Sequence, residues 1–324
     1  MKNIVIIGSG QIGSRHLQGL AKINEDLDIT VIDPSIESLS IASERYLQVE
    51  ELNAGSSVSF KQEIPTFKKL DLAIIATSSN IRKKVIKRLL EISSPNYFII
   101  EKVAFQNLKD FVEIINIFKE KGIISWVNCP NRAFESYKNL KESLDYEGPL
   151  KMHVSGGNWG LASNAIHYLD LFSFFVESTD LEVIESSIDD IIYPSKREGF
   201  LELGGTFIIK SRKNDLLTIE DIKSSNKPVT ITISTQNHRI IINELLGESQ
   251  IKTKKNSWRN LKSAFELTNQ STLTTDIVLK IFKEETSDLI DLEESYRLHK
   301  LIIPLFLDKI NKISNTVIED CPIT

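Results

Sequence analysis

Apolar residues form short continuous runs in the first part of the chain, and segments with helical spacing separate these runs. The runs lie at 3–8, 28–33, 72–77, 97–101 and 123–127, and they are rich in Ile and Val. Continuous apolar runs are typical of strands that are buried on both faces. Helices are expected at 11–24, 36–47, 80–92 and 106–121, with a short strand near Val58. The pattern predicts an α/β fold with a parallel, doubly wound sheet.

The pattern changes after Cys129-Pro130, where we place the boundary between two domains, 1–129 and 130–324. Helices are expected at 132–145, 162–176 and across 274–313, and strands at 151–155, 181–184, 205–210, 216–220, 229–234 and 239–246. Polar Thr230, Thr232 and Ser234 alternate with apolar neighbours, which is the period of a sheet with one solvated face.

Composition excludes several classes of protein. Of the 324 residues, 41% are hydrophobic and 26% are charged, as in an ordinary globular chain. No apolar run reaches the ~18 residues that span a bilayer, and the net charge of −5 gives no reason to expect a nucleic-acid or membrane partner. The N-terminal apolar run is too short for a secretory signal, and Cys129 and Cys321 are too few for a disulfide scaffold or a zinc cluster. We expect a cytoplasmic protein without a metal.

The motif GSGQIG, residues 8–13, follows the first strand and opens a helix. In this context Gly8 allows a tight turn, Gly10 lets the backbone approach a pyrophosphate, and Gly13 lets the helix pack on the sheet. The helix N-terminus supplies N–H groups for the phosphates. The alternative is a turn that merely contains glycines.

Asp33 ends the second strand, 20 residues after Gly13. A carboxylate at this spacing binds the adenosine ribose and repels a 2′-phosphate. The next residues are Pro34 and Ser35, so no Arg follows to hold that phosphate. The motif therefore predicts NAD over NADP, the alternative being that Asp33 is only a turn residue before Pro.

These motifs resemble those of the Gfo/Idh/MocA family of sugar and cyclitol oxidoreductases. The resemblance rests on GSGQIGSRH (8–16), IIATSSN (74–80), IIEKV (99–103), VNCPNRAF (127–134) and AIHYLDLF (165–172). It implies a Rossmann domain, followed by an α/β domain with a large, mostly antiparallel open sheet that often mediates oligomer contacts. The C-terminal helix is expected to pack back on the Rossmann domain.

The resemblance also implies roles for single residues. Lys102 matches a lysine that binds the substrate hydroxyl, and His167 matches the usual general acid/base; His16 is expected close to the cofactor. An imidazole suits proton transfer near neutral pH, and an ammonium stabilises developing alkoxide charge. The expected cofactor-binding residues are Gly8, Gly10, Gln11, Ile12, Gly13, Asp33, Thr77, Asn80 and Glu101.

Two positions depart from the family pattern. The family usually has Pro after the lysine, often with a cis peptide, whereas this chain has Val103. A cis bond before a non-proline residue costs ~3 kcal/mol, so we expect Lys102-Val103 to be trans. The family often has Asp four residues before the histidine, whereas this chain has Ser163 followed by Asn164. We interpret the hydroxyl or amide as a group for a substrate hydroxyl.

Further residues are candidates for substrate binding. Asn158 and Trp159 lie in a glycine-rich stretch that forms either a sugar-binding loop or a packed domain junction. Arg132, after Asn131, is placed either to bind a carboxylate or phosphate or to form an ion pair. Asp170 lies three residues after His167, so it contacts substrate or orients the imidazole.

The leading hypothesis is an NAD-dependent oxidoreductase acting on a secondary alcohol or ketone of a sugar, sugar derivative or nucleotide-sugar. It requires Lys102 and His167 to reach one reacting group. One alternative is an NAD-dependent glycosidase that works by elimination and addition; another is a non-catalytic dinucleotide-binding protein. The apolar alternation over 201–246 favours a homodimer or homotetramer formed through the sheet of the second domain.

Overall fold

The computed structural model describes residues 1–50, 52–144, 146 and 148–324. The chain divides into two compact units. Unit 1 contains residues 1–130, 268–293 and 324, and unit 2 contains 131–267 and 294–323. The chain first passes from unit 1 to unit 2 after Pro130, and 268–293 also belong to unit 1 because helix α7 (Gln270–Glu284) packs against α1 (Gln11–Leu20). No described helix is long and apolar enough to cross a membrane.

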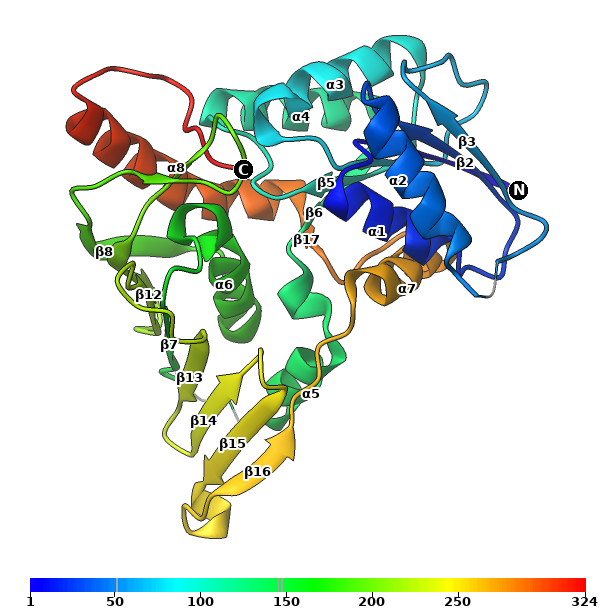
Figure 1. Ribbon diagram of the computed structural model, residues 1–324. Helices are drawn as coiled ribbons and strands as arrows, with labels where there is room; N and C mark the ends of the chain where they lie inside the picture. The colour runs from blue at the N-terminus through cyan, green and yellow to red at the C-terminus, as the bar shows by residue number, and fades with distance from the viewer. Residues whose placement is uncertain (51, 145, 147) are drawn as a thin grey trace. The chain divides into compact units, whose positions relative to one another are not determined.

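Unit 1 is built on a seven-stranded sheet of order β17-β6-β5-β4-β1-β2-β3, in which only the β17–β6 pair is antiparallel (Figure 1). Its other elements are β1 (Lys2–Ile7), β2 (Leu27–Ile32), α2 (Ile36–Leu47), β3 (Ser57–Lys61), β4 (Leu72–Ile75), α3 (Ser79–Ile92), β5 (Tyr97–Glu101), α4 (Leu108–Lys121), β6 (Ile124–Asn128) and β17 (Ile290–Asp291). This confirms the predicted doubly wound sheet.

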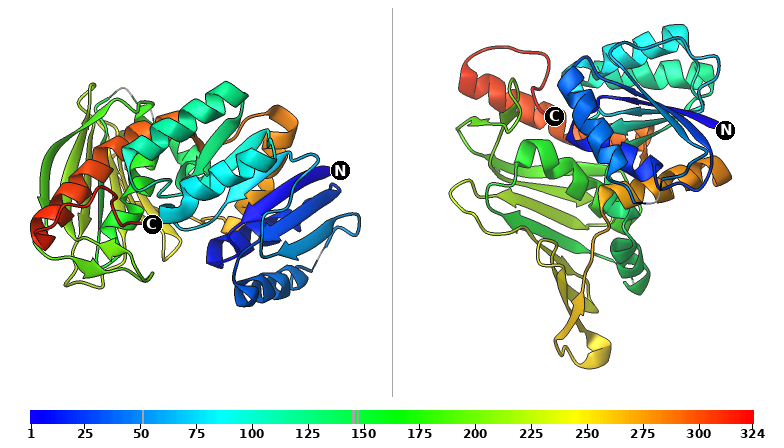
Figure 2. Two further views of the ribbon diagram at one scale, coloured as in Figure 1. Left: turned by 90° about the horizontal axis from the view of Figure 1, so that it is seen from above. Right: turned by 45° about the vertical axis from the view of Figure 1, so that its right-hand side comes forward.

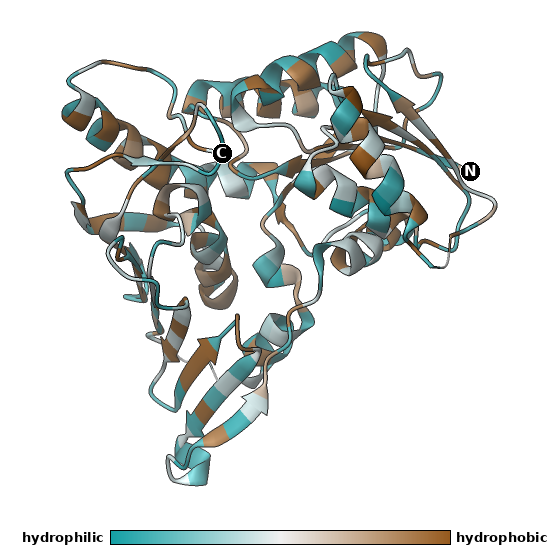
Figure 3. Cartoon of the chain, viewed as in Figure 1, coloured by the Kyte–Doolittle hydropathy of each residue, from teal (hydrophilic) through white to brown (hydrophobic). Residues whose placement is uncertain are grey.

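The central strands of unit 1 are buried along their length. Every residue of β4 and β5 is buried, as are the last four of β1. Helices cover both faces, so the strands need apolar side chains on each side, and they stand out as hydrophobic in Figure 3. The helix ends follow local signals: Asn107 accepts a hydrogen bond from Asp110 N at the start of α4, and Gly122 ends it with a φ of 66°.

Unit 2 is built on an eight-stranded open sheet of order β16-β15-β14-β13-β7-β12-β11-β8, in which only β12–β7 is parallel (Figure 2). Its elements are η1 (Pro130–Ala133), α5 (Glu135–Ser143), β7 (Lys151–Gly156), α6 (Leu161–Val176), β8 (Leu181–Ile188), β9 (Tyr193–Pro194), β10 (Leu201–Glu202), β11 (Gly205–Ser211), β12 (Leu216–Asp221), β13 (Thr230–Ser234), β14 (His238–Asn243), β15 (Glu248–Thr253), η2 (Lys254–Asn256), β16 (Leu261–Ala264) and α8 (Leu292–Ser314). The mostly antiparallel sheet is as predicted.

Several segments of unit 2 differ from the prediction, among them β15 and β16, which were not expected. The expected strand 239–246 ends at Asn243, because Leu245 and Leu246 are exposed in a turn that leads into β15. These two apolar side chains continued the strand pattern without being buried. The expected helix 132–145 is instead η1 followed by α5, and residue 145 lies outside the described residues. The short strands β9 and β10 carried no sequence signal.

Candidate active site

The glycine turn of unit 1 has the geometry that a dinucleotide requires. Gly8 has a φ of 98°, and a Cβ there would lie 2.7 Å from the backbone of Ala76. A Cβ on Gly13 would lie 1.8 Å from Gly8 O, so α1 can pack this closely only with glycine. A Cβ on Gly10 would meet nothing within 4 Å, which leaves the backbone open to a phosphate.

The N-terminus of α1 fits a pyrophosphate. Gly10 precedes the helix without a side-chain cap, and the first turn, which includes Gln11 and Ile12, holds no acidic residue. The hydroxyl oxygens of Ser9 and Thr77 are buried and have no hydrogen-bond partner among the described residues. Uncapped N–H groups and unsatisfied hydroxyls are suited to an anionic ligand, so these residues would hold the phosphates of a dinucleotide cofactor.

Asp33 lies beside this turn and fixes it. Its Oδ2 accepts a hydrogen bond from Ser9 N at 2.8 Å, and its Oδ1 accepts one from Ser35 N at 2.9 Å. Asp33 is therefore a turn residue, yet a carboxylate has acceptor capacity beyond two bonds, so the ribose role is compatible with this geometry. Asn80 is exposed at the start of α3, and its Oδ1 accepts a hydrogen bond from Ser78 Oγ at 2.9 Å.

Lys102 follows β5 and is half-buried. The Lys102-Val103 peptide bond is cis, so the prediction of a trans bond was wrong. The surrounding packing decides the geometry here: Val103 and Ala104 are fully buried, and their carbonyl oxygens accept hydrogen bonds from Arg82. Arg82 also donates to Thr77 O, and it therefore links the lysine segment to the expected cofactor edge.

Glu101 is the centre of a buried network that the sequence did not predict. Its Oε1 lies 2.9 Å from His16 Nε2 and 2.6 Å from Asn128 Nδ2. Burial raises the pKa of Glu101, but the hydrogen bonds and the charge of His16 outweigh this effect, so the pKa lies below its ordinary value. An ionised Glu101 can only accept, so His16 Nε2 must donate to it.

The second ring nitrogen of His16 is also bonded. His16 Nδ1 lies 2.9 Å from Thr274 Oγ1, which also donates to Gln270 O at 2.8 Å. The result is a buried histidine–carboxylate pair directly before Lys102, formed by side chains from α1 and the end of β5 and closed by α7.

In unit 2, α6 exposes a narrow polar line. The helix is mostly buried, and its half-exposed positions are Ser163, Asn164, His167 and Phe174. Residues spaced by three and four lie on one helix face, so His167 shares a face with Ser163 and Asn164. The first half of the helix is thus accessible only through polar side chains, which is suited to binding a polar ligand, whereas Phe174 is the half-exposed residue of the second half.

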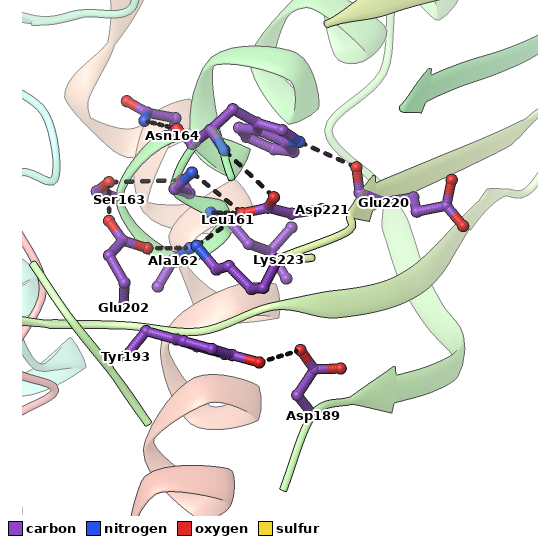
Figure 4. Close-up of polar contacts among 12 residues, drawn as sticks. Leu161, Ala162, Ser163, Asn164, Asp189, Tyr193, Glu202, Glu220, Asp221 and Lys223 are labelled. Atoms are coloured by element: carbon purple, nitrogen blue, oxygen red, sulfur yellow. Dashed lines mark hydrogen bonds and ion pairs between the residues drawn. The ribbon is translucent and has the colours of Figure 1, made fainter. Parts of the chain in front are cut away.

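Figure 4 shows how the start of α6 is held. Ser163 Oγ donates to Glu202 Oε1, and Asn164 Nδ2 donates to Trp159 O at 2.8 Å. Thus a carboxylate does stand beside this turn of the helix, but it comes from β10 and not from α6. The sequence offered no signal for Glu202, because only the tertiary fold brings it to Ser163.

Trp159 is half-buried and packed. Its Nε1 donates to Glu220 O at 3.0 Å, and its ring meets Tyr168 edge-on with centroids 5.4 Å apart. Asn158, next to it, is exposed with a φ of 52°. The tryptophan is therefore anchored within unit 2, while part of its surface stays accessible.

Arg132 and Asp170 pair with each other. Arg132 Nε donates to Asp170 Oδ2 at 2.9 Å, and its Nη2 lies 2.9 Å from Oδ1 and donates to Ser173 Oγ at 3.0 Å. The side chain of Asp170 is 0% exposed. Of the two roles left open for Arg132, the structure shows the ion pair.

Asp170 is expected to make stability depend on pH. Burial, together with nearby Glu294 and despite Arg132, raises the pKa of Asp170 from 3.8 to about 6. A raised folded-state pKa means that its contribution is fully present below pH 3.8 and is lost as pH rises through 6. Relative to Asp170→Asn, the wild type should lose up to ~3 kcal/mol of unfolding free energy from pH 4 to pH 7, at ~1.4 kcal/mol per pKa unit. Urea unfolding of both proteins at several pH values measures this difference, and parallel curves would contradict it.

Residues 2–129 match the family model GFO_IDH_MocA, described as an oxidoreductase family with an NAD-binding Rossmann fold. This region is similar to that family. The resemblance noted in the sequence is thereby confirmed, and the glycine turn and Lys102 lie in the matched NAD-binding Rossmann region. The comparison with curated proteins gave no match.

Solved structures share the fold along nearly the whole chain. A UDP-N-acetylglucosamine 3-dehydrogenase from Acidithiobacillus ferrooxidans is 12% identical with a TM-score of 0.69, over 94% of this chain and 96% of that one. An oxidoreductase from Agrobacterium radiobacter, in complex with NAD+, L-tartaric acid and magnesium, is 12% identical with a TM-score of 0.72, over 93% and 94%. A 3-ketoreductase from Actinomadura kijaniata, in complex with NADP, is 12% identical with a TM-score of 0.70, over 93% and 95%. At this identity the likeness shows the fold alone. Within the described part of this chain, no three His, Cys, Asp or Glu side chains are grouped to hold a metal.

Proposed function

We propose that the protein is an NAD-dependent oxidoreductase that moves hydride between the nicotinamide and a secondary alcohol or ketone of a sugar, sugar derivative or nucleotide-sugar. The observation that carries this proposal is the polar line of α6, where His167 is accessible on an otherwise buried helix beside Ser163 and Asn164. The uncapped N-terminus of α1 supports the choice of a dinucleotide cofactor.

In the proposed reaction the bound NAD supplies the hydride acceptor at nicotinamide C4. His167 takes the hydroxyl proton of the substrate as hydride leaves the carbon, and it returns that proton in the reverse direction. The Lys102 ammonium donates a hydrogen bond to the substrate oxygen and stabilises the negative charge that develops there. The buried pair of Glu101 and His16 holds the strand end that carries Lys102.

A screen of sugars and sugar nucleotides for NADH formation tests the proposed function. Oxidation of at least one secondary alcohol, with one NADH formed for each alcohol consumed, is the expected result. Release of a free sugar without net NADH would favour the NAD-dependent glycosidase. Tight NAD binding without turnover of any probe would favour a non-catalytic dinucleotide-binding protein.

Asp33 is expected to select NAD. We expect the wild type to bind NADH at least ~10-fold more tightly than NADPH, because the carboxylate repels a 2′-phosphate. Asp33→Asn should reduce the ratio of the NADPH dissociation constant to the NADH dissociation constant, mainly by weakening NADH binding. Asp28→Asn, at the opposite end of β2, should leave this ratio unchanged. Fluorescence titrations with the two reduced cofactors measure the ratios. A wild-type preference for NADPH would refute the assignment.

We also propose that the protein forms a homodimer or homotetramer through the open sheet of unit 2. A row of paired residues crosses one face of that sheet, and it includes Ile208, Thr218, His153, Thr232 and Ile241. This face is half-exposed and only partly charged, while the other face is covered by α6 and α8. Thr232→Arg should therefore lower the molar mass in light scattering; an unchanged mass would place the interface elsewhere.

A further inference from the structure

Two carboxylates from outside the helix bind the N-terminus of α6. Asp221 accepts hydrogen bonds from the backbone N–H groups of Trp159, Gly160 and Leu161 at 3.2, 3.1 and 3.1 Å. Lys223 Nζ lies 2.9 Å from Asp221 and neutralises it, and the side chains of both are buried. Asp221 is thus fully engaged in holding the helix start, as Figure 4 shows.

The second carboxylate, Glu202, is placed differently. Its Oε2 accepts from Ala162 N at 3.1 Å, while its Oε1 accepts from the Ser163 hydroxyl. Gly160 makes this meeting possible: its φ is 87°, and a Cβ there would lie 3.0 Å from both Glu202 Oε1 and Ser163 Oγ. The residue before the helix must therefore lack a side chain for the carboxylate and the hydroxyl to come together.

The Glu202 contact decides whether Ser163 Oγ can donate or accept a further hydrogen bond. A hydroxyl has one proton, and an ionised carboxylate can only accept. The weaker acceptor Gly160 O lies 3.4 Å from Ser163 Oγ, so the proton goes to Glu202. Any other partner of Ser163 Oγ must then be a donor.

We propose that Glu202 is a specificity-determining residue that holds Ser163 Oγ as an acceptor for a donor group of the substrate. This inference rests on the proposed function, in which His167, one helical turn after Ser163, exchanges the proton of the reacting hydroxyl. The donor is a second hydroxyl, or an amide N–H, near the reacting carbon. The substrate class is therefore a polyol or acylamino sugar at this position, and not one with a carboxylate or phosphate there.

Glu202→Gln directly tests whether Ser163 Oγ acts as an acceptor. Its amide oxygen can keep the bond to Ala162 N, while its NH2 group donates to Ser163 Oγ and releases the Ser163 proton outward. Asp221 still caps the helix, so the variant should fold. We expect KM for the substrate found in the screen to rise ~10- to 100-fold, the effect of one lost hydrogen bond to a polar group, with kcat changed less than ~3-fold. Glu198→Gln, an exposed glutamate four residues earlier, is the matched control.

The probes are UDP-N-acetylglucosamine, UDP-glucose and myo-inositol, together with glucuronate as an anionic sugar. For each one that is oxidised, we add analogues in which a neighbouring hydroxyl is replaced by hydrogen or by fluorine, which can only accept. The wild type should disfavour the fluoro analogue, whereas Glu202→Gln should bind it better than the wild type does. Ser163→Ala should match the KM rise of Glu202→Gln, and the double variant should add nothing further.

The outcomes separate the two proposals. If a probe is oxidised, three results would overturn the role of Glu202 and leave the proposed oxidoreductase activity intact. They are an unchanged KM in both variants, an unchanged preference between the hydroxyl and fluoro analogues in Glu202→Gln, and glucuronate as the best probe. No NADH with any probe would overturn the proposed function, and the role of Glu202 with it.

Discussion

Replacing His167 by Asn should lower kcat by ~10²- to 10⁴-fold, because the substrate hydroxyl then loses the group that takes its proton while hydride leaves. His167 is half-exposed on α6, so the variant should fold and bind NADH normally. The measurement is steady-state turnover of an oxidised probe, with cofactor binding measured separately.

Lys102→Met should lower kcat by ~10²- to 10³-fold through a different cause, the loss of a donor to the developing alkoxide. The double variant of His167 and Lys102 should lose less kcat than the product of the two separate fold losses, because the effects of groups that act on one transition state are not additive. Near-normal kcat in both single variants would refute the mechanism, even if NAD binding is intact.

The sheet of unit 1 could be predicted from the sequence because its central strands are buried on both faces. Such strands leave continuous apolar runs, and helix α2 was predicted with the bounds that the structure shows. The glycine turn was equally predictable. Gly13 is required by its close approach to Gly8 O and Gly8 by its φ of 98°, so this information lies within one strand-turn-helix segment, although Gly8 also lies close to the backbone of Ala76 after β4.

The pairing partners in the site could not be predicted, because they come from distant parts of the chain. Glu202 reaches Ser163 from a two-residue strand that has no pattern of its own. Arg132 and Asp170 were each considered for substrate, yet packing joins them in a buried ion pair. The cis bond at Lys102-Val103 likewise depends on surroundings that include Arg82. Motifs identify which side chains carry chemistry, and tertiary packing decides which of them are already paired.

Removing His16 from the buried network should cause the largest loss of stability. We expect His16→Leu to lower the free energy of unfolding by ~3–5 kcal/mol, because it leaves the Glu101 carboxylate buried without its hydrogen-bonded partner. Glu101 is 7% exposed and His16 is 1% exposed, so water cannot replace the lost partner without opening the core. Asn128 alone would remain as a neutral donor at 2.6 Å.

The double variant His16→Leu/Glu101→Gln separates loss of charge pairing from loss of packing. It removes the buried charge as well as its partner, so it should recover most of the stability lost in His16→Leu. If the loss came from the altered shape of the side chain, the second substitution would recover nothing, and the ion pair would not be what holds the strand end.

The pH dependence gives an independent check on the same pair. In the wild type the pKa of Glu101 is lowered, so its contribution to stability is present above the ordinary pKa of 4.5 and is lost as pH falls through the lower folded-state value. In His16→Leu the hydrogen bond and charge of His16 are lost, and burial, the largest effect on Glu101, is opposed only by the Asn128 amide and the charge of Arg82, which should raise the pKa of Glu101 above its ordinary value. Its contribution should then be lost as pH rises, so the two proteins should differ more at pH 7 than at pH 4.5. Urea unfolding at these two pH values measures the difference, and a gap that is equal at both would show that Glu101 does not carry the charge assigned to it.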